Sequence, residues 1–357
     1  MKVLQVVGPS SGGIRRHVAT LVEGLRVRDF EVSVAAPKGV FDDLLSGVNP
    51  VPVSLGSQML RARRDLIPLV KEAEVVHAHG LTAGWLCAMA GAGDRLVVTV
   101  HNLVLDEAAG ASAPVLRFLE GRLPARAKET IVISEEMRQR FSSPKGATNH
   151  MHLIAPVGPV PEPSRSKADV RQELAVPEGV PLVVLVGRLH PQKAIDVLIE
   201  AARHIESPVW IAVIGEGPER ENLEGLISRY GLGEVVHLLG RRDDAANYQN
   251  AADVVVMCSL WEGFGLVVAE ALHLRRPVVA TDVGPVSSMI KDGETGRLVP
   301  PNDPEALGEA ISYLLDHPDL GAEMGERGAK LVAAEFDQDG LIDAVANVYS
   351  LAAKDAR

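Results

Sequence analysis

Two glutamates flank a glycine-rich turn in the segment WEGFGLVVAEAL, residues 261–272. Glu262 stands directly before this turn, and Glu270 follows in a run whose apolar spacing predicts a helix. Glycines let the backbone approach a ligand, and the amides that begin a helix bind hydroxyls or phosphate oxygens. We therefore predict that Glu270 accepts two ribose hydroxyls and that three backbone amides bind the same ligand, those of Phe264, Gly265 and Leu266. The alternative is that Glu262 caps the helix and Glu270 is a solvated surface residue.

Two cations follow an apolar strand in the segment LVGRLHPQKAIDVLIEAA, residues 185–202. Arg188 comes directly after the strand, and Lys193 stands where the next helix is expected to begin. A guanidinium binds two phosphate oxygens in a fork, an ammonium acts as a point charge, and a helix dipole favours the same anion. The pair is predicted to hold a diphosphate. The alternative is that both are surface cations on a loop.

An acidic pair for a metal ion is absent from these segments. The Asp-x-Asp of the sequence is Asp337-Gln338-Asp339, which follows the last predicted strand and suits the capping of a helix. We therefore predict metal-independent chemistry, in which Arg188 and Lys193 replace the metal ion on a departing diphosphate.

A second glycine-rich loop, GPSSGGIRRHV (residues 8–18), follows the first predicted strand. Gly12-Gly13 opens a helix but lacks the G-x-G-x-x-G spacing, and no acid ends the second strand, so a NAD site is not favoured. The backbone of Gly13 is instead predicted to approach the distal phosphate of a ligand.

Polar residues end several other predicted strands. His77, His79 and His101 do so in the first half, but a zinc site would need further ligands, so hydrogen-bonded histidines are the favoured interpretation. Gly215 and Arg241 end two strands of the second half, where backbone groups could read a nucleotide base. Ser134 is at least an N-cap. The candidates for an acceptor side are Arg16, His79, Asn102 and Ser134.

These residues need elements that position them, and 357 residues are enough for two domains. Short β-branched runs alternate with helical segments in both halves, which predicts parallel strands covered on both faces. The runs are VLQVV, EVSVAA, VVHAH, LVVTV and TIVIS in the first half, and LVVLVG, VWIAVIG, VVHLLG, DVVVM and PVVAT in the second. A segment rich in Pro and Ser, residues 155–169, separates the halves. We predict an α/β fold with two doubly wound, Rossmann-like domains facing across a cleft, residues 1–160 and 161–338. A closing helix, about 339–357, is expected to cross back to the first domain.

The net charge of −11 is unevenly distributed. Residues 1–160 hold 18 basic and 15 acidic residues, a balance of +3, whereas the rest hold 18 and 32, a balance of −14. The strongly acidic second half argues against nucleic acid as a partner, because nucleic acid binding needs a basic surface. Cys87 and Cys258 lie in apolar runs, which favours buried thiols in a reducing compartment. Without an apolar stretch of membrane-spanning length or a secretory signal, a cytoplasmic protein is expected.

Taken in order, these motifs resemble those of the retaining group 1 glycosyltransferases of GT-B fold, over nearly the whole chain. The matching motifs are the Gly12-Gly13 loop, His77-Ala78-His79, Thr99-Val100-His101-Asn102, Ser134-Glu135, Gly187-Arg188-Leu189 with Lys193, Gly215-Glu216-Gly217-Pro218, and Glu262 with Glu270.

The resemblance implies a role for each residue. Arg188 and Lys193 would bind the donor diphosphate, and Glu270 would bind the nucleotide ribose. Glu262 and the backbone amides after it would bind the donor sugar. Gly13 would approach the phosphate, and His101 would lie beside the reacting sugar. The acceptor would attack on the face from which the diphosphate departs, and a phosphate oxygen would take its proton, so that the anomeric configuration is retained.

The chain departs from the family pattern near these motifs. Ala194 replaces the glycine usual after the lysine, and Arg275 or Arg276 replaces another glycine. Gly284-Pro285 and Ser287-Ser288 stand where the family has Gly-Gly and an acid. These changes are expected to flank the donor sugar.

The expected function is therefore transfer of a hexosyl group from a nucleotide diphosphate sugar to a small-molecule, glycan or lipid-linked acceptor, with no metal and no cofactor. One alternative is a nucleotide-sugar epimerase of the same architecture, which a donor-only assay distinguishes. The other is a non-catalytic relative that binds nucleotide sugar or membrane.

A basic segment, residues 57–73, interleaves cations with apolar side chains. Its cations are Arg61, Arg63, Arg64 and Lys71, and its apolar residues are Met59, Leu60, Leu66, Ile67, Leu69 and Val70. The favoured interpretation is a solvated helix that Pro68 interrupts. The alternative is peripheral contact with an anionic membrane at its inner face, which would bring a lipid-linked acceptor within reach.

Overall fold

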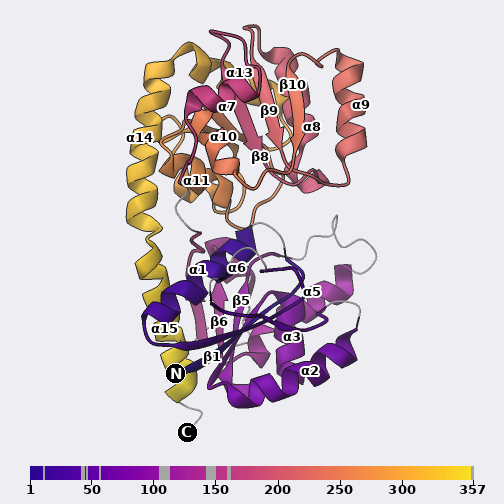
Figure 1. The fold of residues 1–357 in the computed structure, drawn as a ribbon, viewed down its shortest axis with the longest axis vertical. Helices are drawn as coiled ribbons and strands as arrows, with labels where there is room; N and C mark the ends of the chain where they lie inside the picture. The colour runs from indigo at the N-terminus through magenta and orange to yellow at the C-terminus, as the bar shows by residue number, and fades with distance from the viewer. Residues whose placement is uncertain are drawn as a thin grey trace. The chain divides into compact units, whose positions relative to one another are not determined.

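The computed structural model describes residues 1–10, 13–41, 45, 47–55, 58–103, 113–141, 150–158 and 162–354. The chain forms two compact units, one of Met1–Pro159 with Phe336–Arg357 and one of Val160–Glu335. Each is built on a parallel sheet with helices on both faces (Figure 1). The predicted fold class of two Rossmann-like α/β domains is confirmed. The expected boundary at 160/161 lies outside the described residues.

The described sheet of the first unit has the strand order β3-β2-β1-β4-β5-β6-β7. Its strands are β1 (Lys2–Val7), β2 (Glu31–Ala36), β3 (Val51–Pro52), β4 (Val75–His79), β5 (Leu96–Val100), β6 (Glu129–Val132) and β7 (Met151–Leu153). All pairs are parallel, with Val3 of β1 opposite Val32 and Val75. The central strands are buried because their apolar runs face helices on both sides.

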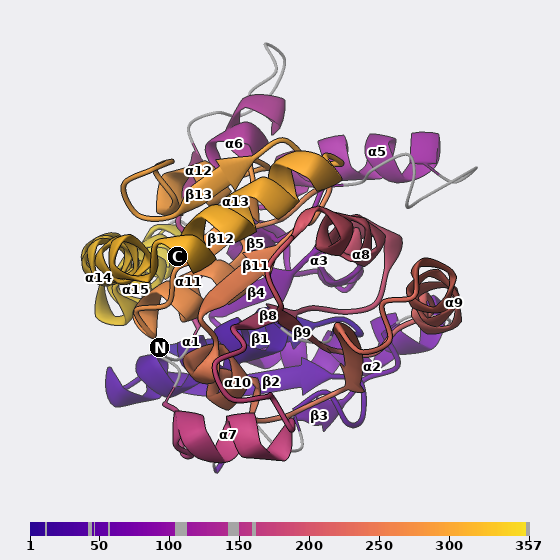
Figure 2. The same ribbon diagram turned by 90° about the horizontal axis from the view of Figure 1, so that it is seen from above.

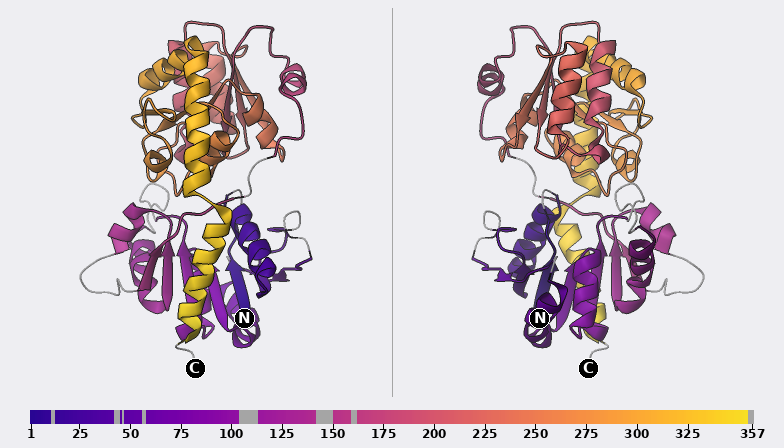
Figure 3. Two further views of the ribbon diagram at one scale, coloured as in Figure 1. Left: turned by 90° about the vertical axis from the view of Figure 1, so that its left-hand side faces the viewer. Right: turned by 90° about the vertical axis from the view of Figure 1, so that its right-hand side faces the viewer.

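Helices α1 (Gly13–Val27) and α15 (Gln338–Lys354) cover one face of this sheet (Figures 1 and 3). The opposite face holds α2 (Met59–Glu72), α3 (Leu81–Met89) and α5 (Ala113–Arg122). A short helix, α6 (Glu135–Phe141), packs on β6 and β7. Among the described residues, none of the helices in either unit combines the length and apolarity needed to cross a bilayer.

Pro68 does not interrupt α2, contrary to the expectation from the sequence. The helix buries Ala62, Leu66 and Val70 on the sheet side, whereas Pro68 is exposed. The helical hydrogen bond that proline cannot donate is therefore lost on the solvent side, where water can satisfy the carbonyl oxygen, while packing holds the buried face.

The described sheet of the second unit has the order β10-β9-β8-β11-β12-β13. Its strands are β8 (Leu182–Val186), β9 (Trp210–Ile214), β10 (Val236–Gly240), β11 (Val254–Met257), β12 (Val278–Thr281) and β13 (Arg297–Val299). Seen from above, α8 (Ile195–Ala201) and α9 (Arg220–Tyr230) lie on one side, and α11 (Leu266–His273) and α14 (Pro318–Glu335) on the other (Figure 2). The remaining helices are α7 (Lys167–Glu173), α10 (Ala245–Ala251), α12 (Val286–Met289) and α13 (Pro304–Asp316).

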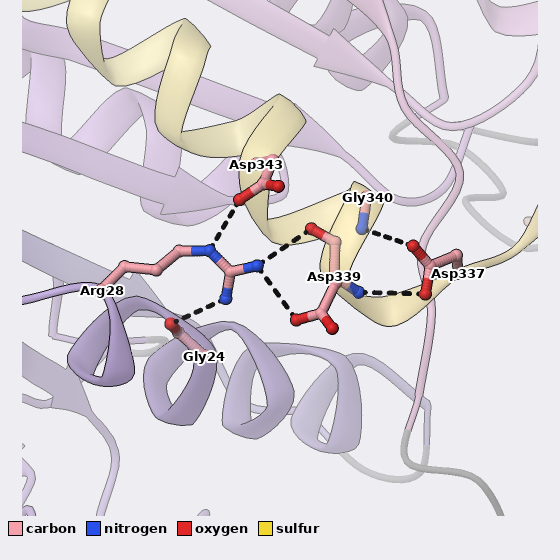
Figure 4. A network of polar contacts seen from close by, with 6 residues as sticks. All are labelled: Gly24, Arg28, Asp337, Asp339, Gly340 and Asp343. Carbon is pink, nitrogen blue, oxygen red and sulfur yellow. Dashed lines mark hydrogen bonds and ion pairs between the residues drawn. The ribbon is translucent and has the colours of Figure 1, made fainter.

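The last helix, α15, packs against α1 and the strands β4, β5 and β6 of the first unit. Its start is held by Arg28, whose guanidinium donates to Asp343 at 2.6 Å and to Asp339 at 3.0 Å (Figure 4). Asp337 accepts from the backbone amide of Gly340 at 2.8 Å. The expected capping role is thus observed for Asp337, whereas Asp339 pairs with Arg28.

Candidate functional site

An ion pair joins the two strongest sequence motifs within the second unit. The Lys193 ammonium lies 2.5 Å from a carboxylate oxygen of Glu262, and the two side chains are 22% and 10% exposed. Ser259 donates its hydroxyl to the same oxygen at 2.6 Å. Lys193 follows β8 and Glu262 follows β11, so the neighbouring ends of two strands bring together residues 69 apart in the sequence.

This pair lies where the strand order of the sheet reverses. From β8 the chain proceeds outward to β9 and β10, and from β11 it proceeds in the other direction to β12 and β13. Open α/β sheets bind ligands beyond the carboxyl ends of their strands at such a switch point. Lys193 and Glu262 therefore lie at the position where open α/β sheets generally bind ligands.

Arg188 is exposed. The side chain of Lys193 lies beside Gly187, the residue that precedes Arg188. A Cβ atom on Gly187 would be 3.7 Å from the Cγ and Cδ atoms of Lys193. Lys193 ends a short 3₁₀ turn, Pro191–Lys193, and α8 begins only at Ile195, so the predicted helix start is two residues early. Between them Ala194 has a left-handed φ of 45°, a conformation that glycine adopts more readily.

The glycine-rich turn after Glu262 has the geometry expected of a close backbone approach. Gly265 has a φ of 86°, and Leu266 is the first residue of α11. Phe264 is 5% exposed and Glu270 is 7% exposed. Glu270 is therefore not a solvated surface residue, and Glu262 pairs with Lys193 while Gly265 occupies the N-cap position. Both alternatives considered from the sequence are wrong.

Gly215 and Arg241 lie at different distances from this pair. A Cβ atom on Gly215 would lie 1.8 Å from the carbonyl oxygen of Gly187, so the ends of β8 and β9 touch here only because residue 215 is glycine. Arg241 follows β10, which β9 separates from β8, and it donates to Asp243 at 2.9 Å with 65% of its side chain exposed. The structure thus places Gly215, but not Arg241, next to the end of β8, the strand that precedes Lys193.

The departures from the family pattern fall at both edges of the sheet. Gly284 (φ 54°) lies beside Glu262, since a Cβ atom there would be 2.6 Å from the Glu262 carbonyl oxygen. Arg275 and Arg276 instead precede β12, where with Arg171 they line a cavity of about 350 Å³. The expectation that these two arginines flank the donor sugar is wrong, because all strands are parallel and their amino ends lie at the opposite edge.

In the first unit, three buried histidines meet at the corresponding switch point, between β1 and β4. His79 is the last residue of β4, and His101 follows β5 directly. The Nδ1 atom of His79 lies 3.0 Å from the Nε2 atom of His101. The third ring, His17 of α1, was missed from the sequence, although its place in the first turns after a glycine-rich loop was a usable signal.

Burial favours the uncharged form of these histidines. Burial lowers the pKa of His17 to about 4, against a weaker opposing hydrogen bond to the Val157 carbonyl oxygen. Burial, followed by repulsion from neighbouring rings, lowers the pKa values of His79 and His101 well below the ordinary value. The ring nitrogens can therefore donate or accept hydrogen bonds to a neutral ligand but contribute no positive charge.

The geometry of this cluster also bears on metal binding. One ring nitrogen from each of His17, His79 and His101 lies within 4.8 Å of the others. Imidazole nitrogens bind zinc, so the cluster has three of the ligands that a zinc site needs. The expectation of metal-independent chemistry stays a prediction.

The other first-unit candidates surround the carboxyl edge of the sheet. Gly13 is the first residue of α1, and Gly12 lies outside the described residues. Asn102 is exposed and Arg16 is half-buried. Ser134 accepts from the Met137 amide at 3.2 Å and is an N-cap, as expected.

Both halves of the chain match models of glycosyltransferase families. Residues 166–331 match the model described as glycosyl transferases group 1. Residues 11–156 match glycosyltransferase family 4.

Curated relatives are enzymes that transfer sugars. A D-inositol 3-phosphate glycosyltransferase of Xylanimonas cellulosilytica is 30% identical over 308 residues, which cover 79% of this chain and 72% of the relative. An alpha-D-kanosaminyltransferase of Streptomyces kanamyceticus is 28% identical over 246 residues, 66% of this chain and 64% of the relative. The match thus spans just under two thirds of the length of this second enzyme.

A solved structure has the same fold over its whole length. Anabaena HepE in complex with UDP and glucose superimposes with a TM-score of 0.87 and 22% identity, covering 98% of this chain and 99% of that one.

Proposed function

Since the chain belongs to the group 1 glycosyltransferases, we propose that it transfers a hexosyl group from a nucleotide diphosphate sugar to a hydroxyl acceptor, with retention. The observation that carries the proposal is the part-buried Lys193–Glu262 pair at the switch point of the second sheet. In this pair the Lys193 ammonium, which can bind a diphosphate, lies next to the Glu262 carboxylate, which can bind sugar hydroxyls.

The proposed division of roles follows the chemistry of each group. Arg188 and Lys193 hold the diphosphate, Glu262 and the backbone of the turn after it hold the sugar, and Glu270 holds the ribose. The acceptor oxygen bonds to the anomeric carbon as the bond from that carbon to the phosphate oxygen breaks. The acceptor proton passes to the released phosphate oxygen.

The acceptor in this proposal is a small molecule, a glycan or a lipid-linked sugar, bound by the first unit. A relative that acts on D-inositol 3-phosphate supports a small polyol as the first acceptor to test. Two other functions are not favoured: a nucleotide-sugar epimerase, and a non-catalytic binding protein. The matched families are named for glycosyl transfer, and the Lys193–Glu262 pair is intact.

A thermal-shift screen of nucleotide sugars tests the donor class. A ligand present at 100 times its Kd stabilises the folded state by about 2.7 kcal/mol. UDP-glucose is the first donor to examine, because HepE was crystallised with UDP and glucose. We expect at least one nucleotide sugar to raise the melting temperature, with no shift from the free sugar. A protein that no nucleotide sugar or nucleoside diphosphate stabilises contradicts the proposal.

Metal independence gives a separate prediction. Transfer should proceed at an unchanged rate after dialysis against EDTA, because Arg188 and Lys193 supply the positive charge for the diphosphate. Initial rates are compared before dialysis, after it, and after adding magnesium, manganese or zinc. Activity that disappears with EDTA and returns with one of these ions would show that this part of the proposal is wrong.

We also propose peripheral contact of the first unit with anionic membranes. Of twelve large apolar side chains that are exposed among the described residues, ten belong to this unit. In α2, Leu60 is 85% exposed and Met59 47%, beside Arg61 and Arg64. Leu66 and Val70 face the core, so the contact is limited to the first turn of the helix.

Sedimentation with phosphatidylglycerol vesicles tests this contact. Each cation near an anionic surface contributes about 1 kcal/mol, so the triple substitution of Arg61, Arg63 and Arg64 by alanine should reduce binding by roughly a hundredfold. The charge-matched control replaces Arg229, Lys291 and Lys330, exposed cations of the second unit, and should bind normally. No binding of the unaltered protein at low salt would end the proposal.

A further inference from the structure

A continuous chain of buried hydrogen bonds connects His101 to helix α15. His101 contacts His79 at 3.0 Å, and the Nε2 atom of His79 contacts the side-chain oxygen of Gln5 at 2.8 Å. The amide nitrogen of Gln5 donates to the Tyr349 hydroxyl at 2.8 Å. That hydroxyl contacts His77 at 2.7 Å, and His77 contacts Thr99 at 2.7 Å. All these side chains are at most 5% exposed, so water cannot replace a missing partner.

The orientation of the Gln5 side-chain amide sets the direction of this chain, because its nitrogen faces Tyr349 and its oxygen faces His79. Burial among uncharged hydrogen-bond partners favours the neutral imidazole, so each of these rings carries one N–H. The Gln5 oxygen can only accept, so His79 donates from Nε2, and its Nδ1 must accept from His101. His101 therefore has its proton on Nε2 and a lone pair on Nδ1.

The same logic applies on the other side of Gln5. The Tyr349 oxygen accepts from the Gln5 amide, so its O–H is the donor to Nδ1 of His77, and His77 donates from Nε2 to Thr99. Rotating the Gln5 amide by half a turn would reverse every bond and move the proton of His101 to Nδ1. Tyr349 couples the orientation of Gln5 to the tautomer of His77, so one half of the chain cannot reverse alone.

From this geometry we infer that Tyr349 is a positioning residue, which keeps Nδ1 of His101 available as a hydrogen-bond acceptor for a sugar hydroxyl. The inference rests on the proposed function, because it assigns a substrate to the carboxyl edge of the first sheet. It adds helix α15 to this first-unit site, because Arg28 holds the start of α15 beside α1 and Tyr349 of α15 contacts His77.

The test is Tyr349→Phe, which removes the hydroxyl but keeps the ring that packs against Phe30 and His77. We expect kcat for transfer to fall on the order of tenfold while KM for the nucleotide sugar stays within about twofold, because the orientation of an imidazole changes and the donor contacts do not. Tyr230→Phe is the control: it removes a tyrosine hydroxyl that donates to Glu200 in the second unit, and should leave both constants unchanged.

The tautomer is read directly by long-range ¹H–¹⁵N correlation spectra of protein labelled at histidine, with or without enzymatic activity. We expect a proton on Nε2 of His101 in the unaltered protein and exchange between both tautomers in Tyr349→Phe. A His101 protonated on Nδ1 in the unaltered protein overturns the inference even if the variant does not fold. A Tyr349→Phe variant in which the His101 tautomer and kcat are both unchanged also overturns the inference. Zinc bound by His17, His79 and His101 would overturn it as well. If the tautomers are as expected but the unaltered protein transfers no sugar, the result counts against the proposed function and not against this inference.

Discussion

Replacing Lys193 with alanine lowers the turnover of sugar transfer by about a hundredfold or more, with the fold retained. One electrostatic donor to a developing negative charge typically contributes about 3 kcal/mol to transition-state stabilisation, and each 1.36 kcal/mol changes a rate tenfold. The Lys193 side chain is 22% exposed at the switch point of its sheet, so its charge is only partly screened by water. The measurement is kcat under saturating donor, with Lys330→Ala, an exposed lysine of α14, as the control.

The ion pair requires a second variant to separate catalysis from stability. Alanine at position 193 leaves the Glu262 carboxylate with the Ser259 hydroxyl but without its cation, and breaking a buried pair in this way commonly costs about 3–5 kcal/mol. The double variant Lys193→Ala with Glu262→Gln removes the uncompensated charge. It should recover melting temperature relative to Lys193→Ala alone but not turnover. Near-normal turnover in either variant would show that Lys193 does not stabilise the transition state.

Replacing Glu270 with alanine weakens the binding of the nucleoside diphosphate by roughly 10- to 100-fold. A hydrogen bond to a charged group contributes about 1.5–3 kcal/mol, and the proposed ribose diol would lose its carboxylate acceptor. Glu270 is 7% exposed in α11, one turn beyond the glycine-rich segment. Calorimetric titration with the free nucleoside diphosphate gives the affinity, and Glu309→Ala, on the exposed side of α13, is the matched control.

The 2′,3′-dideoxy nucleotide makes this test specific for the ribose contact. The unaltered protein should bind it more weakly than the normal nucleotide, whereas Glu270→Ala should bind both with equal affinity. If Glu270→Ala instead discriminates between the two as strongly as the unaltered protein does, the carboxylate has a structural role.

The sequence predicted those parts of the fold that have strong local signals. Apolar runs identified all the central strands, because strands buried on both faces are rich in valine, isoleucine and leucine. The edge strands β3, β7 and β13 were missed: each has only two or three residues, too few for a pattern. Pro68 was misjudged because intrinsic helix preference cannot anticipate that its neighbours Leu66 and Val70 anchor the helix.

For the candidate site, the sequence identified residues but not their contacts. Lys193 and Glu262 were each recognised from their own motif, but nothing local shows that they bond to each other, since β8 and β11 become neighbours only when the sheet forms. His17 and Tyr349 were missed as members of the histidine network because their partners lie on other elements. Arg275 and Arg276 were assigned to the wrong edge, because the side of a sheet that a loop occupies depends on strand direction.

The central claim is transfer from a nucleotide sugar with retention, and the most direct measurement is an NMR time course with UDP-glucose and an inositol phosphate acceptor. Anomeric proton couplings report the configuration of the product, and the phosphorus signals report release of the diphosphate. We predict a new glycosidic anomeric signal with the α configuration of the donor, appearing at the rate at which nucleoside diphosphate is released, and loss of both signals in Lys193→Ala. If another nucleotide sugar from the thermal-shift screen is the donor, its product should likewise keep the anomeric configuration of that donor. A product of inverted configuration, or a donor that is epimerised without release of diphosphate, would contradict the account.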